Sequence, residues 1–307
     1  MKKILIISKI SLITFLLFSC NSSENPFAYQ SNTHSRGDAS FMVDESYKLL
    51  FETLEYTFEG QRPDANLDIQ FTPENEAINA LFMDKTKTIC ISRDLTKEEK
   101  AKLLRNRIEI VSNKLAKDGI ALIVNQENKD TLITVDEIKN ILLGKTTKWS
   151  SSQKDISIVF DHENSANFAY FQNLTNKAPW TKNVFASKSS EEVIEYVKKN
   201  KNAIGIIGVN WLSDEDDKRV LAYLNGITLM SVAKTKNDKY LKPYQAFIFT
   251  DEYALTREVW FLNKGKIDGL NTGFVNFCVR EKGQLIIHKA CLVPAYPPMR
   301  QLRIVTE

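Results

Sequence analysis

Residues 118–125 read DGIALIVN, and the apolar stretch from Gly119 to Asn125 predicts a strand. Thr134 and Glu137 follow at the spacing of a capping box, which predicts the start of a helix. An apolar strand over 156–160 and a helix over 166–174 come next. Strands that alternate with helices along the chain predict an α/β fold.

The same alternation extends outward from this stretch, from about Gly37 almost to the carboxyl end. Upstream the pattern predicts a helix over 44–58, a strand over 67–71, a second helix from 72 onward and a strand over 87–91. Downstream it predicts a helix that begins at Ser189, four strands and a last helix, with the later elements over 203–209, 227–232, 246–250, 255–262 and 270–280. No internal repeat interrupts this order.

Length and composition are those of an ordinary globular protein. At ~100–200 residues per domain, 307 residues predict about two units. Lys and Arg exceed Asp and Glu by 41 − 38 = 3. This excess of three equals the number of lysines within the first twenty residues, which are Lys2, Lys3 and Lys9. The chain without that leader is formally neutral, which argues against nucleic acid as a partner.

The amino terminus has the pattern of an export signal. Residues 1–20 combine two lysines, a short apolar run and Cys20, and Lys9 leaves too few apolar residues in a row to cross a bilayer. The end of this segment, LFSC, resembles a bacterial lipobox, so we expect a signal peptide over 1–20, lipidation of Cys20 and a polar tether over 21–36. The alternative is a plain secretory signal with an incidental cysteine. We therefore expect an exported protein, lipid-anchored to a bacterial membrane in the periplasm or cell envelope, with no other membrane attachment.

The cysteines and histidines predict no metal site and no cofactor. Lipidation of Cys20 would leave Cys90, Cys278 and Cys291, an odd number without a CxxC motif. The three histidines are far apart in the sequence and lack ligand spacing.

Several segments in the right order carry a family resemblance. Residues 118–125, 132–134, 137–145 and 148–150 resemble the central part of phosphate ABC transporter substrate-binding proteins, which are type II periplasmic binding proteins. Further matching segments are 91–95, 203–208, 253–257 and 283–294. The resemblance implies a two-lobed α/β fold with a mixed sheet flanked by helices in each lobe and a ligand cleft between them. It places one lobe in 37–118 plus 240–307 and the other in 119–239.

The resemblance also implies a site and partners. Such proteins hold a small oxyanion such as phosphate at three loops that precede helices, and they deliver it to ABC permease subunits. The matching positions here are Asp44, Glu45, Ser46, Ser92, Arg93, Asp94, Asn164, Ser165, Ala166 and Asn167. Helix amino termini carry unsatisfied N–H groups and partial positive charge, so several of them aimed at one point would bind an anion.

Individual roles within these loops stay open at this point. The family uses an acidic group to accept a proton from the ligand, and either Asp44 or Asp94 could take that part here. Each serine could instead be a helix N-cap that touches no ligand.

The third loop departs from the family pattern. Family members have an arginine where this chain has Asp161, and a carboxylate there would repel an oxyanion unless it turned outward or met a cation. His162 could offer a donor or could be an ordinary exposed loop residue.

Three functions follow from these observations. The first is the substrate-binding lipoprotein of an ABC importer for phosphate or a related oxyanion. The second is a surface or periplasmic lipoprotein of the same fold that has lost phosphate and senses or binds another ligand, which Asp161 favours. The third, an enzyme, is not expected, because the sequence has no nucleophile elbow, P-loop or metal set.

Overall fold

The computed structural model describes residues 32–214, 216–265 and 268–297. The predicted signal peptide, Cys20 and the first part of the tether lie outside these residues. The end of the predicted tether is folded: the Thr33 amide donates to the Arg36 carbonyl at 2.9 Å, and the Leu270 amide donates to Asn32 Oδ1 at 2.7 Å. Among the described residues no helix combines the length and the apolar character that crossing a bilayer requires.

Three parallel strands from the first part of the chain form one edge of a mixed sheet. The central strand of this group pairs in parallel with both neighbours. The third strand of the group also pairs antiparallel with a strand from late in the chain, and that strand pairs antiparallel on its other side with a long strand. In sheet order these are β2 (Ala65–Thr72), β1 (Gly37–Asp44), β3 (Thr88–Ile91), β11 (Thr256–Lys264) and β4 (Ile110–Asn125).

The same sheet continues from the second half of β4. This half pairs antiparallel with the next strand, which is followed by two strands in parallel order. They are β8 (Ala203–Gly208), β6 (Ser157–Phe160) and β7 (Val184–Ala186), while β9 (Ile227–Leu229) and β12 (Val293–Pro294) also pair with β4. A separate two-stranded sheet joins β5 (Leu132–Thr134) to β10 (Ser231–Ala233).

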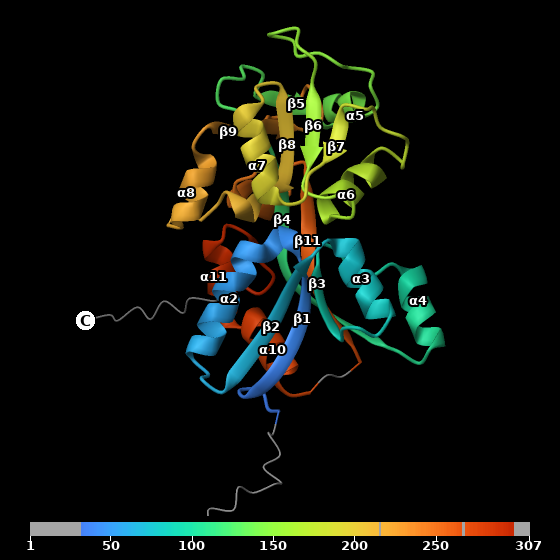
Figure 1. Cartoon of the computed structure of the whole chain (residues 1–307), viewed down its shortest axis with the longest axis vertical. Helices are drawn as coiled ribbons and strands as arrows, with labels where there is room; N and C mark the ends of the chain where they lie inside the picture. The colour runs from blue at the N-terminus through green and yellow to red at the C-terminus, as the bar shows by residue number, and fades with distance from the viewer. Residues whose placement is uncertain (1–31, 215, 266–267, 298–307) are drawn as a thin grey trace, which may run out of the picture. The chain divides into compact units, whose positions relative to one another are not determined.

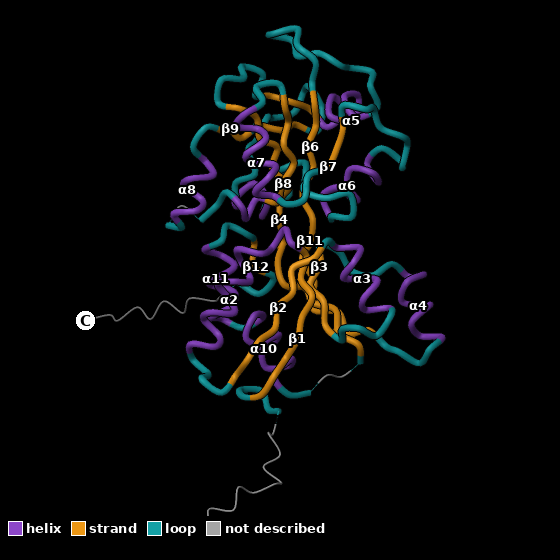
Figure 2. Tube along the Cα trace, in the orientation of Figure 1, coloured by secondary structure: helices purple, strands orange, loops and turns teal. Residues whose placement is uncertain are grey.

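Helices flank the first group of strands, as Figures 1 and 2 show. One core contains side chains of α2 (Lys48–Gly60), α10 (Leu270–Val279) and α11 (Glu281–Lys289), and a short 3₁₀ turn, η1 (Glu45–Tyr47), leads into α2. A second core joins β3 to α3 (Glu74–Phe82) and α4 (Lys97–Arg105).

Helices also flank the second group of strands. One core contains α5 (Val135–Leu142), α6 (Ala166–Leu174) and α9 (Gln245–Phe249). The other contains α7 (Ser190–Lys199), α8 (Lys218–Leu224) and the 3₁₀ turn η2 (Val209–Trp211). A mixed sheet with helices packed against both groups of strands confirms the predicted α/β class.

Strand β4 changes partners at the position where the opening stretch begins. Residues 110–119 pair with β11, whereas residues 120–124 pair with β8. The predicted strand over 119–125 is therefore confirmed as the fully buried half of a longer strand. The other half escaped prediction because its residues 110–118 read IVSNKLAKD, where pairs of apolar residues are separated by polar ones, so they show neither strict alternation nor an unbroken apolar run.

One predicted strand is wrong, and another is divided in two. Residues 246–250 lie mostly in α9, because only Ile248 of this short apolar run is buried and Phe249 stays 66% exposed. The predicted strand over 227–232 is broken at Met230 into β9 and β10, which pair with different strands. Ile248 packs in the same core as Ile120. The lobe boundaries expected from the family resemblance stay a prediction.

Candidate anion-binding site

The three predicted loops converge where β1, β3 and β6 end. The backbone of Ala166 lies close enough to Asp44 to oppose the rise that burial causes in the pKa of Asp44, and the Asn75 amide donates to the Asn164 carbonyl at 3.2 Å. Burial raises the pKa of Glu74, which lies beside the second loop, and the charge of Asp44 raises it further. The fold thus brings together segments that are far apart in the sequence.

The first loop presents two buried polar atoms. The Ser46 amide donates to Asp44 Oδ1 at 2.8 Å, and Asp44 and Ser46 are 1% and 0% exposed. Asp44 Oδ2 and Ser46 Oγ have no hydrogen-bond partner among the described residues. Burial raises the pKa of Asp44, while Arg257, the nearby Ser46 hydroxyl and the Ser46 and Ala166 amides oppose that shift.

Glu45 contacts the start of α7. Its Oε1 accepts from the Ser190 amide at 3.3 Å. Burial and the nearby Asp161 and Asp44 charges raise the pKa of Glu45 to about 8.

The donors of the second loop are taken by carboxylates of the chain. The Ser92 amide and hydroxyl both donate to Glu74 Oε2, at 2.8 and 2.5 Å. Arg93 makes two bonds to Glu99, at 2.7 and 2.9 Å, and its Nε lies 3.3 Å from Glu74. The helix that follows begins only at Lys97, so its amino terminus does not lie at Ser92.

Asp94 is not brought to the other loops as a free acceptor. Lys100 and Ser112 bind its carboxylate at 2.5 and 2.8 Å, and the Leu95 amide donates to it at 2.8 Å. Although partial burial raises the pKa of Asp94, these bonds hold it below its ordinary value. Of the two residues considered as proton acceptor, only Asp44 has an unpaired buried oxygen.

The third loop carries its own carboxylate inside. Asp161 is fully buried and accepts from the Ser165 hydroxyl at 2.5 Å and from Asn167 Nδ2 at 2.8 Å. Burial raises its pKa to about 6, against the effect of these two bonds. Ser165 also caps α6, because its Oγ accepts from the Phe168 amide at 3.1 Å.

His162 and Asn164 of this loop contact each other. The Asn164 amide donates to His162 Nδ1 at 3.1 Å. Asn164 is exposed and His162 is partly buried, so neither adds a buried donor to the site.

Sequence reasoning missed a buried ion pair beside the loops. Arg257 of β11 donates through Nε to Asp118 Oδ2 of β4 at 2.9 Å and through Nη1 to Asn167 Oδ1 at 2.9 Å. Both charged side chains are at most 4% exposed. The signal for this pair was Arg257 within one predicted apolar strand and Asp118 just before another. When two such charged side chains are buried, they must pair.

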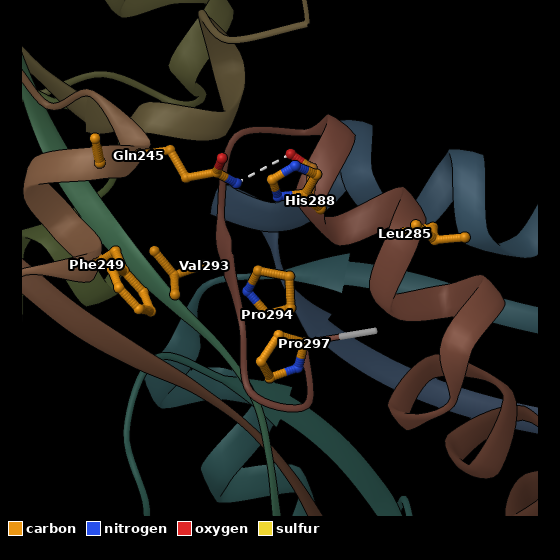
Figure 3. Close-up of a pocket in the computed structure, with 8 residues that line it drawn as sticks. Gln245, Phe249, Leu285, His288, Val293, Pro294 and Pro297 are labelled. Atoms are coloured by element: carbon orange, nitrogen blue, oxygen red, sulfur yellow. Dashed lines mark hydrogen bonds between the residues drawn. The ribbon is translucent and has the colours of Figure 1, made fainter. Parts of the chain in front are cut away.

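A separate hollow lies between α9, α11 and β12, as Figure 3 shows. Gln245 Nε2 donates to the His288 carbonyl across it at 3.0 Å. Its volume is about 500 Å³, and its lining is Gln245, Ala246, Phe249, Leu285, His288, Val293, Pro294 and Pro297. The described residues of this lining include no lysine, arginine or carboxylate, so the hollow does not suit an oxyanion.

A family model described as a PBP superfamily domain matches residues 30–282. The chain belongs to this superfamily. Phosphate-binding protein PstS of Staphylococcus aureus strain USA300 is 28% identical over 206 residues, which are 63% of this chain and 59% of that relative. The chain thus spans about three fifths of the length of the curated relative it matches.

Solved structures of the superfamily share the fold. A protein described as a phosphate ABC transporter substrate-binding protein, with bound phosphate, from Clostridium perfringens has a TM-score of 0.72 and 23% identity over 84% of this chain and 100% of its own. An ABC-type phosphate transport receptor from Vibrio cholerae has a TM-score of 0.64 and 19% identity over 83% of this chain and 99% of its own. The predicted resemblance and the type II periplasmic binding protein fold are confirmed. These relatives are named for binding or transport, in agreement with the prediction of a non-enzymatic superfamily member.

Proposed function

We propose that this protein is the substrate-binding lipoprotein of an ABC importer and captures phosphate or a related small oxyanion at the three loops. The observation that carries the proposal is the pair Asp44 Oδ2 and Ser46 Oγ, buried and unpaired among the described residues beside the start of α6. A helix amino terminus favours an anion, a serine hydroxyl can donate to it, and a carboxylate can accept a ligand O–H. Protonated phosphate meets all three requirements, whereas sulfate has no hydrogen to give at neutral pH.

One observation favours the alternative, a protein that has lost phosphate and binds something else. Glu74 holds the donors of Ser92, and Asp161 holds those of Ser165 and Asn167. An incoming anion must displace these carboxylates or bind without the donors that they occupy. The alternative therefore stays as the second candidate.

Isothermal titration of the detergent-solubilised full-length chain tests both candidates. We expect phosphate to bind at least tenfold more tightly than sulfate, a difference of about 1.4 kcal/mol. Asp44→Asn replaces the acceptor by an amide and should reduce that preference to less than about threefold. Asp94→Asn should keep it, since Asp94 is bonded to Lys100 and Ser112. Heat of binding with arsenate or phosphonates, together with no heat of binding with phosphate, would favour the alternative.

The lipid anchor is part of the same proposal, and Cys20 lies outside the described residues. The lipobox-like ending LFSC predicts that Cys20 carries the acyl chain. We expect Cys20→Ser to move most of the protein from the membrane fraction to the soluble fraction of cells, because one apolar anchor is lost. Cys291→Ser is the matched control and should leave the distribution unchanged. A Cys20→Ser variant that stays with the membrane would contradict lipidation.

A further inference from the structure

Unpaired buried polar atoms gather around Arg257. Five of those that have no hydrogen-bond partner among the described residues lie on neighbouring groups, namely Asp44 Oδ2, Ser46 Oγ, Tyr47 Oη, Asn210 Oδ1 and Arg257 Nη2. Asn210 Nδ2 donates to the Ser46 carbonyl at 2.5 Å, and the guanidinium carbon of Arg257 lies 5.3 Å from the centre of the Tyr47 ring. A buried polar atom without a partner is unfavourable, so a water or a ligand is expected among them.

The guanidinium of Arg257 is held on two sides. Nε donates to Asp118 and Nη1 to Asn167. Nη2 lies 2.9 Å from the same Asp118 oxygen but is not aligned to hydrogen-bond with it. One nitrogen of a fixed, charged group therefore keeps its donor capacity.

Gly208 leaves space in front of this nitrogen. A Cβ at Gly208 would lie 3.0 Å from Arg257 Nη2 and 3.6 Å from Ser46 Cβ. The backbone of Gly208 has φ −69° and ψ 145°, which any residue adopts, so it is the space and not the conformation that a side chain would change. The space joins Arg257 to the first loop.

Arg93, the arginine expected from the sequence, has no such capacity. Its Nη1 and Nη2 donate to Glu99, Nη1 also to the Asp94 carbonyl, and its Nε lies against Glu74. Its side chain is 35% exposed, whereas that of Arg257 is 4% exposed. An ion contact to Arg257 would thus be desolvated, which strengthens it.

We infer that Arg257, rather than Arg93, supplies the positive charge that binds the oxyanion, through Nη2 and across the space left by Gly208. This inference rests on the proposed function and assigns its specificity-determining cation to strand β11. Asp118 and Asn167 orient the guanidinium, and the third loop, which contains the carboxylate of Asp161, needs no cation of its own.

The test is phosphate titration of the full-length chain with two site variants and matched controls. Arg257→Lys keeps a positive charge that can pair with Asp118 but removes the branched N–H donors of the guanidinium. Gly208→Ala fills the space in front of Nη2 and leaves Arg257 unchanged. Both should weaken phosphate binding at least tenfold. Arg219→Lys, in an exposed pair with Asp217 and Glu52, and Gly60→Ala, where a Cβ meets nothing within 4 Å, should stay within about twofold.

Each outcome decides the inference. Unchanged phosphate affinity in both site variants would overturn it and would show that only water fills the space, as would a tenfold loss in Arg93→Lys without a loss in Arg257→Lys. Gly208→Ala decides alone if melting curves show that Arg257→Lys does not fold. A wild-type chain that binds no phosphate overturns the proposed function as well, whereas binding by the wild type and by both variants overturns only the role of Arg257.

Discussion

Asp118→Ala is expected to lower the free energy of unfolding by about 3–5 kcal/mol. The variant leaves the Arg257 guanidinium buried and charged without the carboxylate that it contacts at 2.9 Å. Burial lowers the pKa of Arg257, but Tyr47, Asp118 and Asp44 together raise it above its ordinary value, so the side chain stays charged. The loss falls toward the lower limit if Asp44 compensates part of that charge.

Denaturant unfolding measures this prediction. The matched control is Glu127→Ala, which removes an exposed pair with Lys201 and should cost less than about 1 kcal/mol. The double variant Asp118→Ala/Arg257→Met should regain part of the loss, because it leaves no unpaired charge. Equal effects of Asp118→Ala and Glu127→Ala would refute the buried pair as a source of stability.

Glu45→Gln is expected to make the stability of the chain less dependent on pH. Burial raises the pKa of Glu45 from 4.5 to about 8, so the folded chain binds this proton more tightly than the unfolded chain. The contribution of Glu45 to stability is therefore complete below about pH 4.5 and is lost as the pH rises through about 8. Glutamine cannot ionise and keeps an acceptor for the Ser190 amide.

Melting temperatures across pH measure the effect. Wild type and Glu45→Gln should melt together near pH 4, and the variant should melt roughly 5–10 °C higher at pH 9, for a difference on the order of 3 kcal/mol. Glu127→Gln, on an exposed side chain, serves as control and should track the wild type at every pH. Parallel curves for wild type and Glu45→Gln would mean that Glu45 titrates normally.

The carboxylates of the site bear on function as well as on stability. Glu74 and Asp161 are buried, and each accepts hydrogen bonds from donors that the sequence assigned to a ligand. In this chain, therefore, buried acidic side chains hold the donors of the second and third candidate loops, and the unpaired atoms lie instead around Asp44, Ser46 and Arg257.

Local features were predicted well because their causes are local. The capping box at Thr134 is formed, since a threonine and a glutamate three residues later satisfy each other's backbone whatever surrounds them. The run over 246–250 failed because a short apolar segment suits a strand or a helix, and packing of Ile248 against the core selected the helix.

Local sequence patterns were enough to predict the α/β class and the order of most strands and helices, because apolar periodicity and caps act over a few residues. The loops of the candidate site followed from the family resemblance. Only the tertiary structure decided what those loops do with their donors. The partners of Ser92, Asp94 and Arg257 lie 18, 18 and 139 residues away along the chain. Folding brings polar and charged groups from distant parts of the chain together, where burial favours their pairing, and no local pattern records which pairs form.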